Sequence, residues 1–174
     1  AAVIAPGPRT HDGLMLDSQD ADESTNTRKL INRMIGDLLG ADMSSSDSEL
    51  ESTWHDDMCW FGPAGIGATF TIDRYVQQHQ FPFNDGLTDI AYDDHDCLIT
   101  EGRYGGLFSW TGFTMKPTGG FMGLPATNSA STMRVVDIYR RDGDKLAENW
   151  VFIDILHFLH QQGLDVLERM RQIT

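Results

Sequence analysis

Residues 134–163 read RVVDIYRRDGDKLAENWVFIDILHFLHQQG and contain the strongest strand, turn and helix signals of the chain. Two runs rich in β-branched and aromatic residues flank Asp142-Gly143-Asp144, a turn signal of the kind that joins neighbouring antiparallel strands. The pattern predicts strands over 131–141 and 145–155 that pair as a hairpin. Apolar residues then recur at helical spacing, which predicts a last helix over 156–172 with Gly163 as a weak point.

Upstream of the hairpin, the chain contains further strand patterns that are separated by turn signals. Candidate strands lie at 89–93 and 98–113, with the acidic turn 93–96 between them. A shorter one at 58–61 leads into the glycine loop GPAGIG. Because these connections are of the hairpin type, we expect a mainly antiparallel sheet.

Helical patterns come before most of these strands. Each predicted helix has its own signal: an apolar stripe over 28–43, a capping-box pair at Ser46 and Glu49, and a Thr71 cap for a helix over 71–80. Helices followed by a meander of long strands are an α+β layout.

The composition is that of a single globular domain. With 174 residues, 40% of them hydrophobic and 22% charged, the chain has material for one well-buried core. Residues 1–24 combine Pro, Gly and acidic residues without apolar periodicity. They predict a mobile N-terminal arm, followed by the domain proper at 25–174.

Charge and hydropathy limit the partners. No apolar run approaches the ~18 residues that span a bilayer, and the first residues lack a basic start followed by an apolar core. Cys59 and Cys97 form no pattern, which fits a reducing compartment better than a disulfide framework, and we interpret both as plain core or surface thiols. We therefore expect a cytoplasmic protein with no membrane contact. The net charge of −13 would repel a phosphate backbone, so nucleic acid is not an expected partner.

Three stretches together resemble the SnoaL-like family: the GPAGIG loop after Trp60, the QHQFPF helix end, and the run at 134–163. The similarity covers about residues 28–165. It implies the cone-shaped fold shared with nuclear transport factor 2 and ketosteroid isomerase, in which a strongly curved antiparallel sheet and three helices enclose a pocket. The resemblance also implies a homodimer formed through the sheet.

The family's polyketide cyclases use a His on the penultimate strand and an Asp on the last strand as an acid/base pair. Aligning the D-G hairpins puts Asp137 at the first of these positions and Val151 at the second. The resemblance therefore does not carry over the catalytic pair intact, and a catalytic hypothesis has to use the residues present.

Asp137 is the first candidate catalytic residue. It lies in a strand of large side chains and shares a face with Met133, Val135 and Tyr139. If that face lines the pocket, burial should raise the pKa of the carboxyl and suit it to proton transfer near neutrality. The alternative is a structural ion pair with Arg103 or Arg134.

His79 is the second candidate, because it shares the apolar face of the helix over 71–80 with Ile72, Tyr75 and Val76. There it could exchange a proton with a bound carbonyl compound, or it could be an ordinary core histidine. Candidate substrate-binding residues are the aromatic side chains Trp60, Tyr104, Trp110 and Trp150, which could equally be core. We interpret Glu148 as a solvent or interface charge, and Asp154 as a brace or cap for the last helix.

Other site chemistries find no support in the sequence. His55-Asp56-Asp57 with His79 lacks the spacing of a metal site, and GPAGIG lacks the spacing and strand–helix context of a phosphate cradle. We expect neither a metal nor a cofactor. The favoured hypothesis is acid/base cyclisation, isomerisation or hydrolysis of an apolar carbonyl compound, polyketide- or lactone-like. The alternative is a non-catalytic small-molecule carrier of the same fold, and the fold alone does not choose between them.

Overall fold

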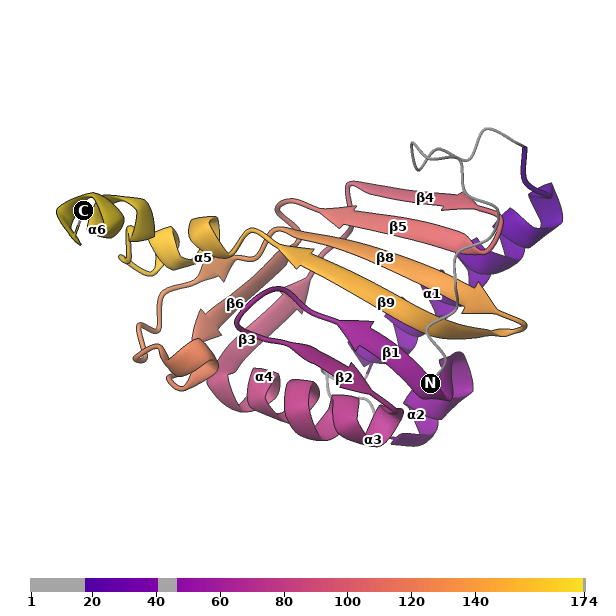
Figure 1. Cartoon of the computed structure of the whole chain (residues 1–174), viewed down its shortest axis with the longest axis horizontal. Coiled ribbons are helices and arrows are strands. Elements are labelled where there is room, and N and C mark those ends of the chain that lie inside the picture. The colour runs from indigo at the N-terminus through magenta and orange to yellow at the C-terminus, as the bar shows by residue number, and fades with distance from the viewer. Residues whose placement is uncertain (1–17, 41–46, 174) are drawn as a thin grey trace.

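The computed structural model describes residues 18–40 and 47–173, and in them the predicted α+β class is confirmed. A curved six-stranded sheet has the order β2-β1-β9-β8-β5-β4, and a smaller sheet has the order β3-β6-β7 (Figure 1). The strands are β1 (Trp54–Phe61), β2 (Ala68–Phe70), β3 (Leu87–Tyr92), β4 (Cys97–Glu101), β5 (Tyr104–Ser109), β6 (Phe113–Pro117), β7 (Ser131–Thr132), β8 (Val135–Asp142) and β9 (Lys145–Ile153).

The helices lie on one side of the large sheet and beyond its ends (Figure 1). They are α1 (Ala21–Gly40), α2 (Asp47–Thr53), α3 (Ile72–Tyr75), the π-helical η1 (Val76–Gln80), α4 (Phe81–Gly86), the 3-10 turn η2 (Phe121–Gly123), α5 (Ile155–Gln161) and α6 (Val166–Ile173). No helix in this part of the chain is long and apolar enough to cross a membrane. The predicted cytoplasmic location stays a prediction.

The predicted hairpin is confirmed as β8 and β9. They pair antiparallel from Val135 opposite Ile153 to Asp142 opposite Lys145, with Gly143 in the turn at φ 61°. A positive φ of this kind favours glycine, which explains the D-G signal. Among the described strands the pairs are antiparallel except for β1 with β9, which are parallel.

The predicted single strand over 98–113 is wrong, because the chain reverses once within it and bends again at 110–112. Glu101 pairs with Tyr104 across a two-residue turn that holds Gly102 at φ 55°, which separates β4 from β5. After Ser109 the chain bends without reversing into β6 of the smaller sheet, since Ser109 lies opposite Val135 and Thr114 lies opposite Thr132 in almost the same register. Neither the turn at 102–103 nor the bend at 110–112 has a Pro or Asn-Gly signal, so the sequence shows no clear boundary there.

The helix boundaries differ from the predicted ones at several points. Helix α1 begins at Ala21, ahead of the predicted domain start at residue 25, because the Asp20 carboxylate accepts hydrogen bonds from the backbone of Asp22 and Glu23. The rest of the predicted arm, residues 1–17, and the predicted helix end at 41–43 lie outside the described residues. The predicted last helix is divided into α5 and α6 at Gly163, which has a φ of 83°. The sequence indicates this glycine as the weak point of the helix.

The predicted helix over 71–80 is longer than expected and continues through Pro82 to Gly86 as α3, η1 and α4. Pro82, which has no backbone N–H to donate within a helix, lies just after the π-helical turn η1. Thr71 caps the segment, since its hydroxyl accepts from the backbone of Arg74 at 3.4 Å. A π-helical turn changes the direction in which its side chains point, and such turns often occur at functional sites.

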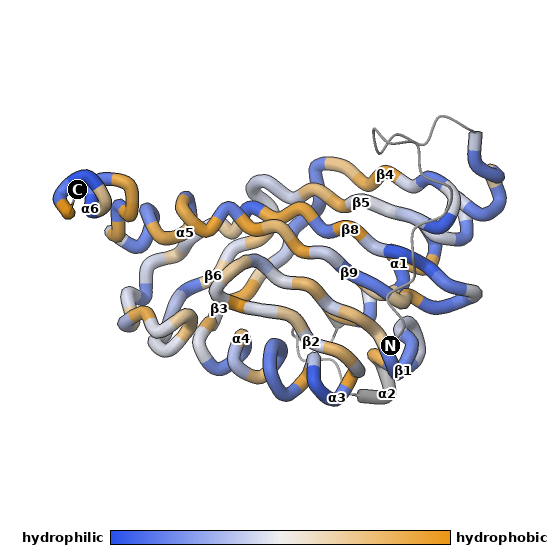
Figure 2. Tube along the Cα trace, viewed as in Figure 1, coloured by the Kyte–Doolittle hydropathy of each residue, from blue (hydrophilic) through white to orange (hydrophobic). Residues whose placement is uncertain are grey.

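Two apolar clusters hold these layers together, and Val151 packs against both. The first lies between α1 and the large sheet and includes the fully buried Ile31. Helix α1 can approach the sheet closely because Gly105 faces Ile31. A Cβ at Gly105 would come within 2.3 Å of the Ile31 side chain. The second surrounds Phe158 and Met133. Figure 2 shows apolar residues along the strands of the large sheet and on α5 and α6.

Candidate functional site

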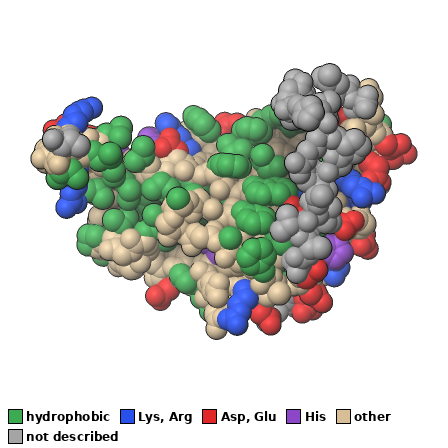
Figure 3. Space-filling model, viewed as in Figure 1, with side chains coloured by type: hydrophobic (Ala, Val, Ile, Leu, Met, Phe, Trp, Pro, Cys, Tyr) green, Lys and Arg blue, Asp and Glu red, His purple; other side chains and the backbone are tan. Residues whose placement is uncertain are grey.

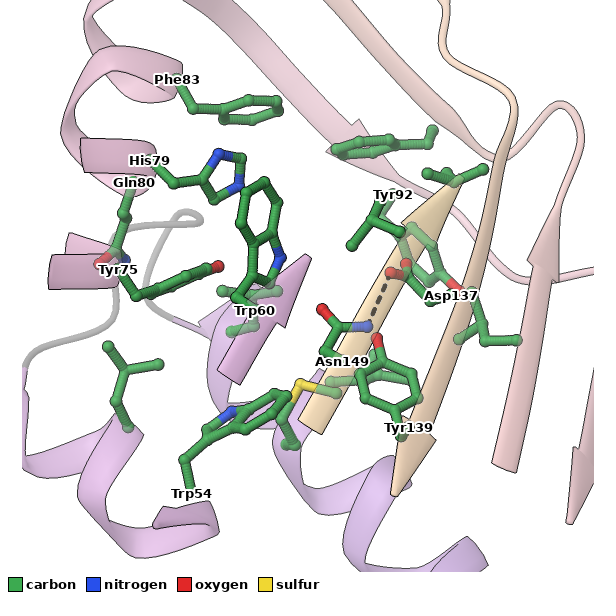
Figure 4. Close-up of a pocket in the computed structure, with 18 of the residues that line it drawn as sticks. Trp54, Trp60, Tyr75, His79, Gln80, Phe83, Tyr92, Asp137, Tyr139 and Asn149 are labelled. Atoms are coloured by element: carbon green, nitrogen blue, oxygen red, sulfur yellow. Dashed lines mark hydrogen bonds between the residues drawn. The ribbon is translucent and has the colours of Figure 1, made fainter. Parts of the chain in front are cut away.

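A cavity of about 160 Å³ lies between the helical segment 72–86 and the inner face of the large sheet (Figure 4). Its lining is mostly apolar and aromatic, the character of most small-molecule sites. Ten of the described lining residues carry polar side chains: Asp37, Thr53, Tyr75, His79, Gln80, Asn84, Tyr92, Asp137, Tyr139 and Asn149. The structure thus brings both candidate catalytic residues, Asp137 and His79, to one cavity.

Asp137 reaches the cavity because side chains alternate along β8, which turns Val135, Asp137 and Tyr139 to the inner face. Burial raises the pKa of the Asp137 carboxyl from 3.8 to about 6. The predicted alternative, an ion pair with arginine, is wrong. Arg103 pairs with Glu23, and Arg134 pairs with Asp154.

Asn149 is a site residue that the sequence reasoning missed. Its amide Nδ2 donates to Asp137 Oδ1 at 3.2 Å and lies 3.3 Å from the Ile138 carbonyl oxygen (Figure 4). The first of these bonds favours the ionised carboxylate and so opposes the rise in pKa. Asn149 lies opposite Tyr139, one inward position along from Val151, and it therefore reaches Asp137 diagonally.

His79 occupies the opposite, helical wall of the cavity. Its ring stacks on Trp60 with centroids 3.9 Å apart and also contacts Tyr75 and Phe83. Burial lowers the pKa of the imidazole from 6.5 to about 4. At neutral pH His79 is therefore uncharged, and it can donate or accept one hydrogen bond but cannot act as an imidazolium acid.

Two tyrosines, Tyr75 and Tyr139, add hydroxyl groups that the sequence reasoning did not assign to the site. Burial, with the Asp137 carboxyl as a further cause, raises the pKa of both phenols, so both stay protonated. Within the described residues neither hydroxyl has a hydrogen-bond partner. Figure 4 shows the Tyr75 hydroxyl pointing from the helical wall towards the side that carries Asp137 and Asn149. The sequence pattern places Tyr75 on the same predicted helix face as His79.

Of the four predicted substrate-binding aromatics, only Trp60 lines the cavity. Trp150 alternates with Asn149 and Val151, so it lies on the outer face of the sheet and stacks on Phe61 at 5.9 Å. Tyr104 precedes Gly105, which faces α1, so its side chain points to the outer face as well. This corrects the predicted cavity wall.

Trp110 also lies away from the cavity. It follows the end of β5, is 50% exposed, and packs under the Arg134 guanidinium at 5.6 Å from its ring centre. The aromatic part of the wall instead includes Trp54, Phe83 and Phe113.

The remaining polar predictions have mixed outcomes. Glu148 is not a solvent charge, because it is buried and pairs with Arg140 at 2.8 Å. Asp154 caps α5, as predicted, by accepting from the backbone of His157 at 3.0 Å. His55 bonds to the Asp142 carbonyl, and no cluster of three or more potential metal ligands occurs among the described residues.

Comparison with known proteins gives a family match. The model of the family described as SnoaL-like polyketide cyclase matches residues 50–162. That range includes Trp60, His79, Asp137 and Asn149. None of the curated proteins compared with the chain matches it.

Several solved structures share the fold. An NTF2-like protein from Burkholderia xenovorans LB400 has a TM-score of 0.63 and 12% identity, over 80% of this chain and 97% of its own. TsrD from Streptomyces laurentii has a TM-score of 0.63 and 19% identity, over 78% and 96%. A protein with a ketosteroid isomerase-like fold from Catenulispora acidiphila, solved with trimethylamine, has a TM-score of 0.58 and 10% identity, over 75% and 92%. At these identities the likeness concerns the fold alone.

Proposed function

Because the chain belongs to the SnoaL-like polyketide cyclase family, we propose that it is a small-molecule enzyme in which Asp137 is the general base. One observation carries the proposal. The Asp137 carboxyl lines an apolar cavity, has a pKa near 6 and is held by the Asn149 amide. A base with such a pKa is ionised at neutral pH and still binds a proton well enough to abstract one.

The proposed reaction acts on a carbonyl compound with an acidic C–H bond next to the carbonyl group. The Asp137 carboxylate takes the proton from that carbon, and the electron pair of the C–H bond moves to the carbonyl oxygen as an enolate. Tyr75, on the facing wall, donates a hydrogen bond to this oxygen as its charge develops. Neutral His79 is placed to donate a second one.

The class of reaction depends on the next step. Return of the proton to a different carbon gives isomerisation, and attack of the enolate carbon on a second carbonyl gives cyclisation. Water activated by Asp137 would instead give hydrolysis. A cavity of about 160 Å³ holds roughly one ring, so a larger polyketide- or lactone-like substrate would place its reacting ring inside and the rest at the mouth.

This proposal can be tested without knowing the natural substrate. A ketone with exchangeable α-protons, such as 2-tetralone, is incubated in D₂O, and deuterium uptake is followed by mass spectrometry. Wild type should accelerate the uptake, and Asp137→Asn should lose about 10²–10⁴-fold of that acceleration, the range for a positioned base. Asp56→Asn, at an exposed carboxylate, is the matched control. Equal uptake by wild type and Asp137→Asn would contradict the assignment.

A second candidate function, a non-catalytic carrier, is favoured by Val151. It pairs directly with Asp137 across the hairpin and fills the family's second acid/base position with a side chain that cannot hold a proton. A carrier needs only the aromatic lining. Saturable binding of 2-tetralone with no deuterium uptake would support this function over the enzyme.

We also propose that the chain forms a homodimer through the outer face of the large sheet. Hydrophobic side chains gather over these strands (Figure 3). Phe152 is 57% exposed, Ile99 56% and Phe70 46%. Apolar side chains gathered in this way on one face are typical of a protein interface.

A further inference from the structure

The charged groups around the cavity are unevenly distributed. Its titratable lining residues are two carboxylates, one histidine and three tyrosines: Asp37, Asp137, His79, Tyr75, Tyr92 and Tyr139. Among the residues that the structure describes, no lysine or arginine lines the cavity. Since His79 and the tyrosines are uncharged at neutral pH, the formal charges on the described part of the lining are all negative.

The arginines on the nearby strands do not offset this charge, because each is engaged by another carboxylate. Arg134 pairs with Asp154, Arg140 pairs with Glu148 at 2.8 Å, and Arg141 pairs with Glu23 at 2.6 Å. Arg140 and Glu148 are both buried. None of these arginines lines the cavity, so within residues 18–40 and 47–173 an anionic ligand would find no cationic partner there.

An anion inside the cavity would therefore lose its water and meet the Asp137 carboxylate. At about 5 Å and an effective dielectric of about 20, two like charges repel strongly, and because Asp137 can relieve the repulsion only by binding a proton, an anion should bind on the order of 10-fold more weakly near pH 7.5. An uncharged ligand of the same shape avoids this repulsion and can still use the hydroxyls of Tyr75 and Tyr139 as hydrogen-bond donors.

We propose that this cavity selects by charge: the part of the substrate that enters it carries an uncharged carbonyl group, and the corresponding carboxylate is rejected by Asp137. That the ligand is a substrate rests on the function proposed above, whereas the rejection of anions does not. The ligand class is thus a neutral carbonyl compound in which at most one ring enters the cavity.

Benzamide and benzoate test this proposal, because they match in size and shape and differ in charge. Their dissociation constants are measured by calorimetry or ligand-observed NMR at pH 7.5, where benzoate and Asp137 are both ionised. We expect benzamide to bind at least about tenfold more tightly than benzoate. In Asp137→Asn, benzoate should approach benzamide in affinity, while benzamide should change little. Asp56→Asn should preserve the discrimination of wild type.

Three results would overturn the proposal: equal affinities in wild type, unchanged discrimination in Asp137→Asn, or no binding of either compound. The assay is separate from the deuterium-uptake test of function. If 2-tetralone shows no uptake while benzamide is still preferred, the enzyme proposal fails and charge selection holds for a carrier. If uptake occurs and benzoate binds equally well, the enzyme proposal survives and charge selection fails.

Discussion

The Asn149 amide donates a hydrogen bond to the Asp137 carboxylate over 3.2 Å, although the residue directly opposite Asp137 in the hairpin is Val151. The Asp137 carboxyl thus has one hydrogen-bonding neighbour, Asn149, and one neighbour without a polar side chain, Val151. The apolar surroundings raise the pKa of Asp137, and Asn149 limits that rise. The working range of the proposed base therefore depends on burial first and on this hydrogen bond second.

Asn149→Leu should move the pH profile of the proposed activity towards alkaline values. The substitution removes the hydrogen bond that favours the ionised carboxylate, so the pKa of Asp137 should rise above its present value of about 6. The measurement is deuterium uptake by 2-tetralone between pH 5 and 9. Wild type should lose activity as pH falls through about 6, and the variant should lose it at higher pH. An unmoved acidic limb would show that Asn149 does not tune the base.

Asp137→Asn should stabilise the folded protein above pH 6. The folded pKa of about 6 exceeds the ordinary value of 3.8, so folding binds a proton, and stability is lost as pH rises from about 4 to 6. Two pKa units correspond to about 3 kcal/mol at most. The variant should melt several degrees above wild type at pH 7.5 and close to it at pH 4. A variant that melts lower at both pH values would contradict the burial of an ionised carboxyl.

His79→Gln should have the opposite pH signature. The folded pKa of about 4 lies below the ordinary 6.5, so the contribution of His79 to stability is present above pH 6.5 and is lost as pH falls towards 4. The loss is again about 3 kcal/mol. Melting curves of variant and wild type should therefore converge as the pH is lowered from 7 to 4. A constant difference across this range would mean that His79 titrates normally.

Sequence patterns identified the hairpin, the α+β class and the facing positions of Asp137 and His79, because these depend on local periodicity. They did not identify the inward face of β9. Along that strand both alternating sets contain apolar residues, Asn149-Val151-Ile153 on one side and Glu148-Trp150-Phe152 on the other. Trp150 was therefore placed in the cavity, and Asn149 was overlooked.

The boundary errors have a similar physical origin. Turn chemistry predicted the reversal at Gly143, but the reversal at Gly102 has no comparable signal in its neighbours. Pairing partners come from distant parts of the chain, such as β1 with β9, and periodicity within one segment contains no information about them. For function, the consequence is that the sequence could assign candidate residues to strands. Which residues of a strand such as β9 face the cavity could be determined only from the strand register.

Tyr75→Phe should slow deuterium uptake without destabilising the protein. The change removes a hydroxyl that has no hydrogen-bond partner among the described residues and keeps the ring that packs on Trp60 at 5.8 Å. Loss of one donor to a developing oxyanion typically lowers kcat by about 10²–10³-fold. Tyr139→Phe, on the sheet wall, is the matched comparison and should have the smaller effect. The reverse order would place the oxyanion site beside Asn149 and reverse the proposed orientation of the substrate.

Phe152→Asp should convert a dimer into a monomer if the outer face of the large sheet is the subunit interface. Phe152 is 57% exposed on that face, and an aspartate there would have to lose its hydration on association. Molar mass from light scattering after size exclusion measures the outcome directly. Leu167→Asp is the control, because Leu167 is 53% exposed on α6, away from the sheet, and should leave the molar mass unchanged. A monomeric wild type would refute the dimer, and a dimer that dissociates only with Leu167→Asp would move the interface to α6.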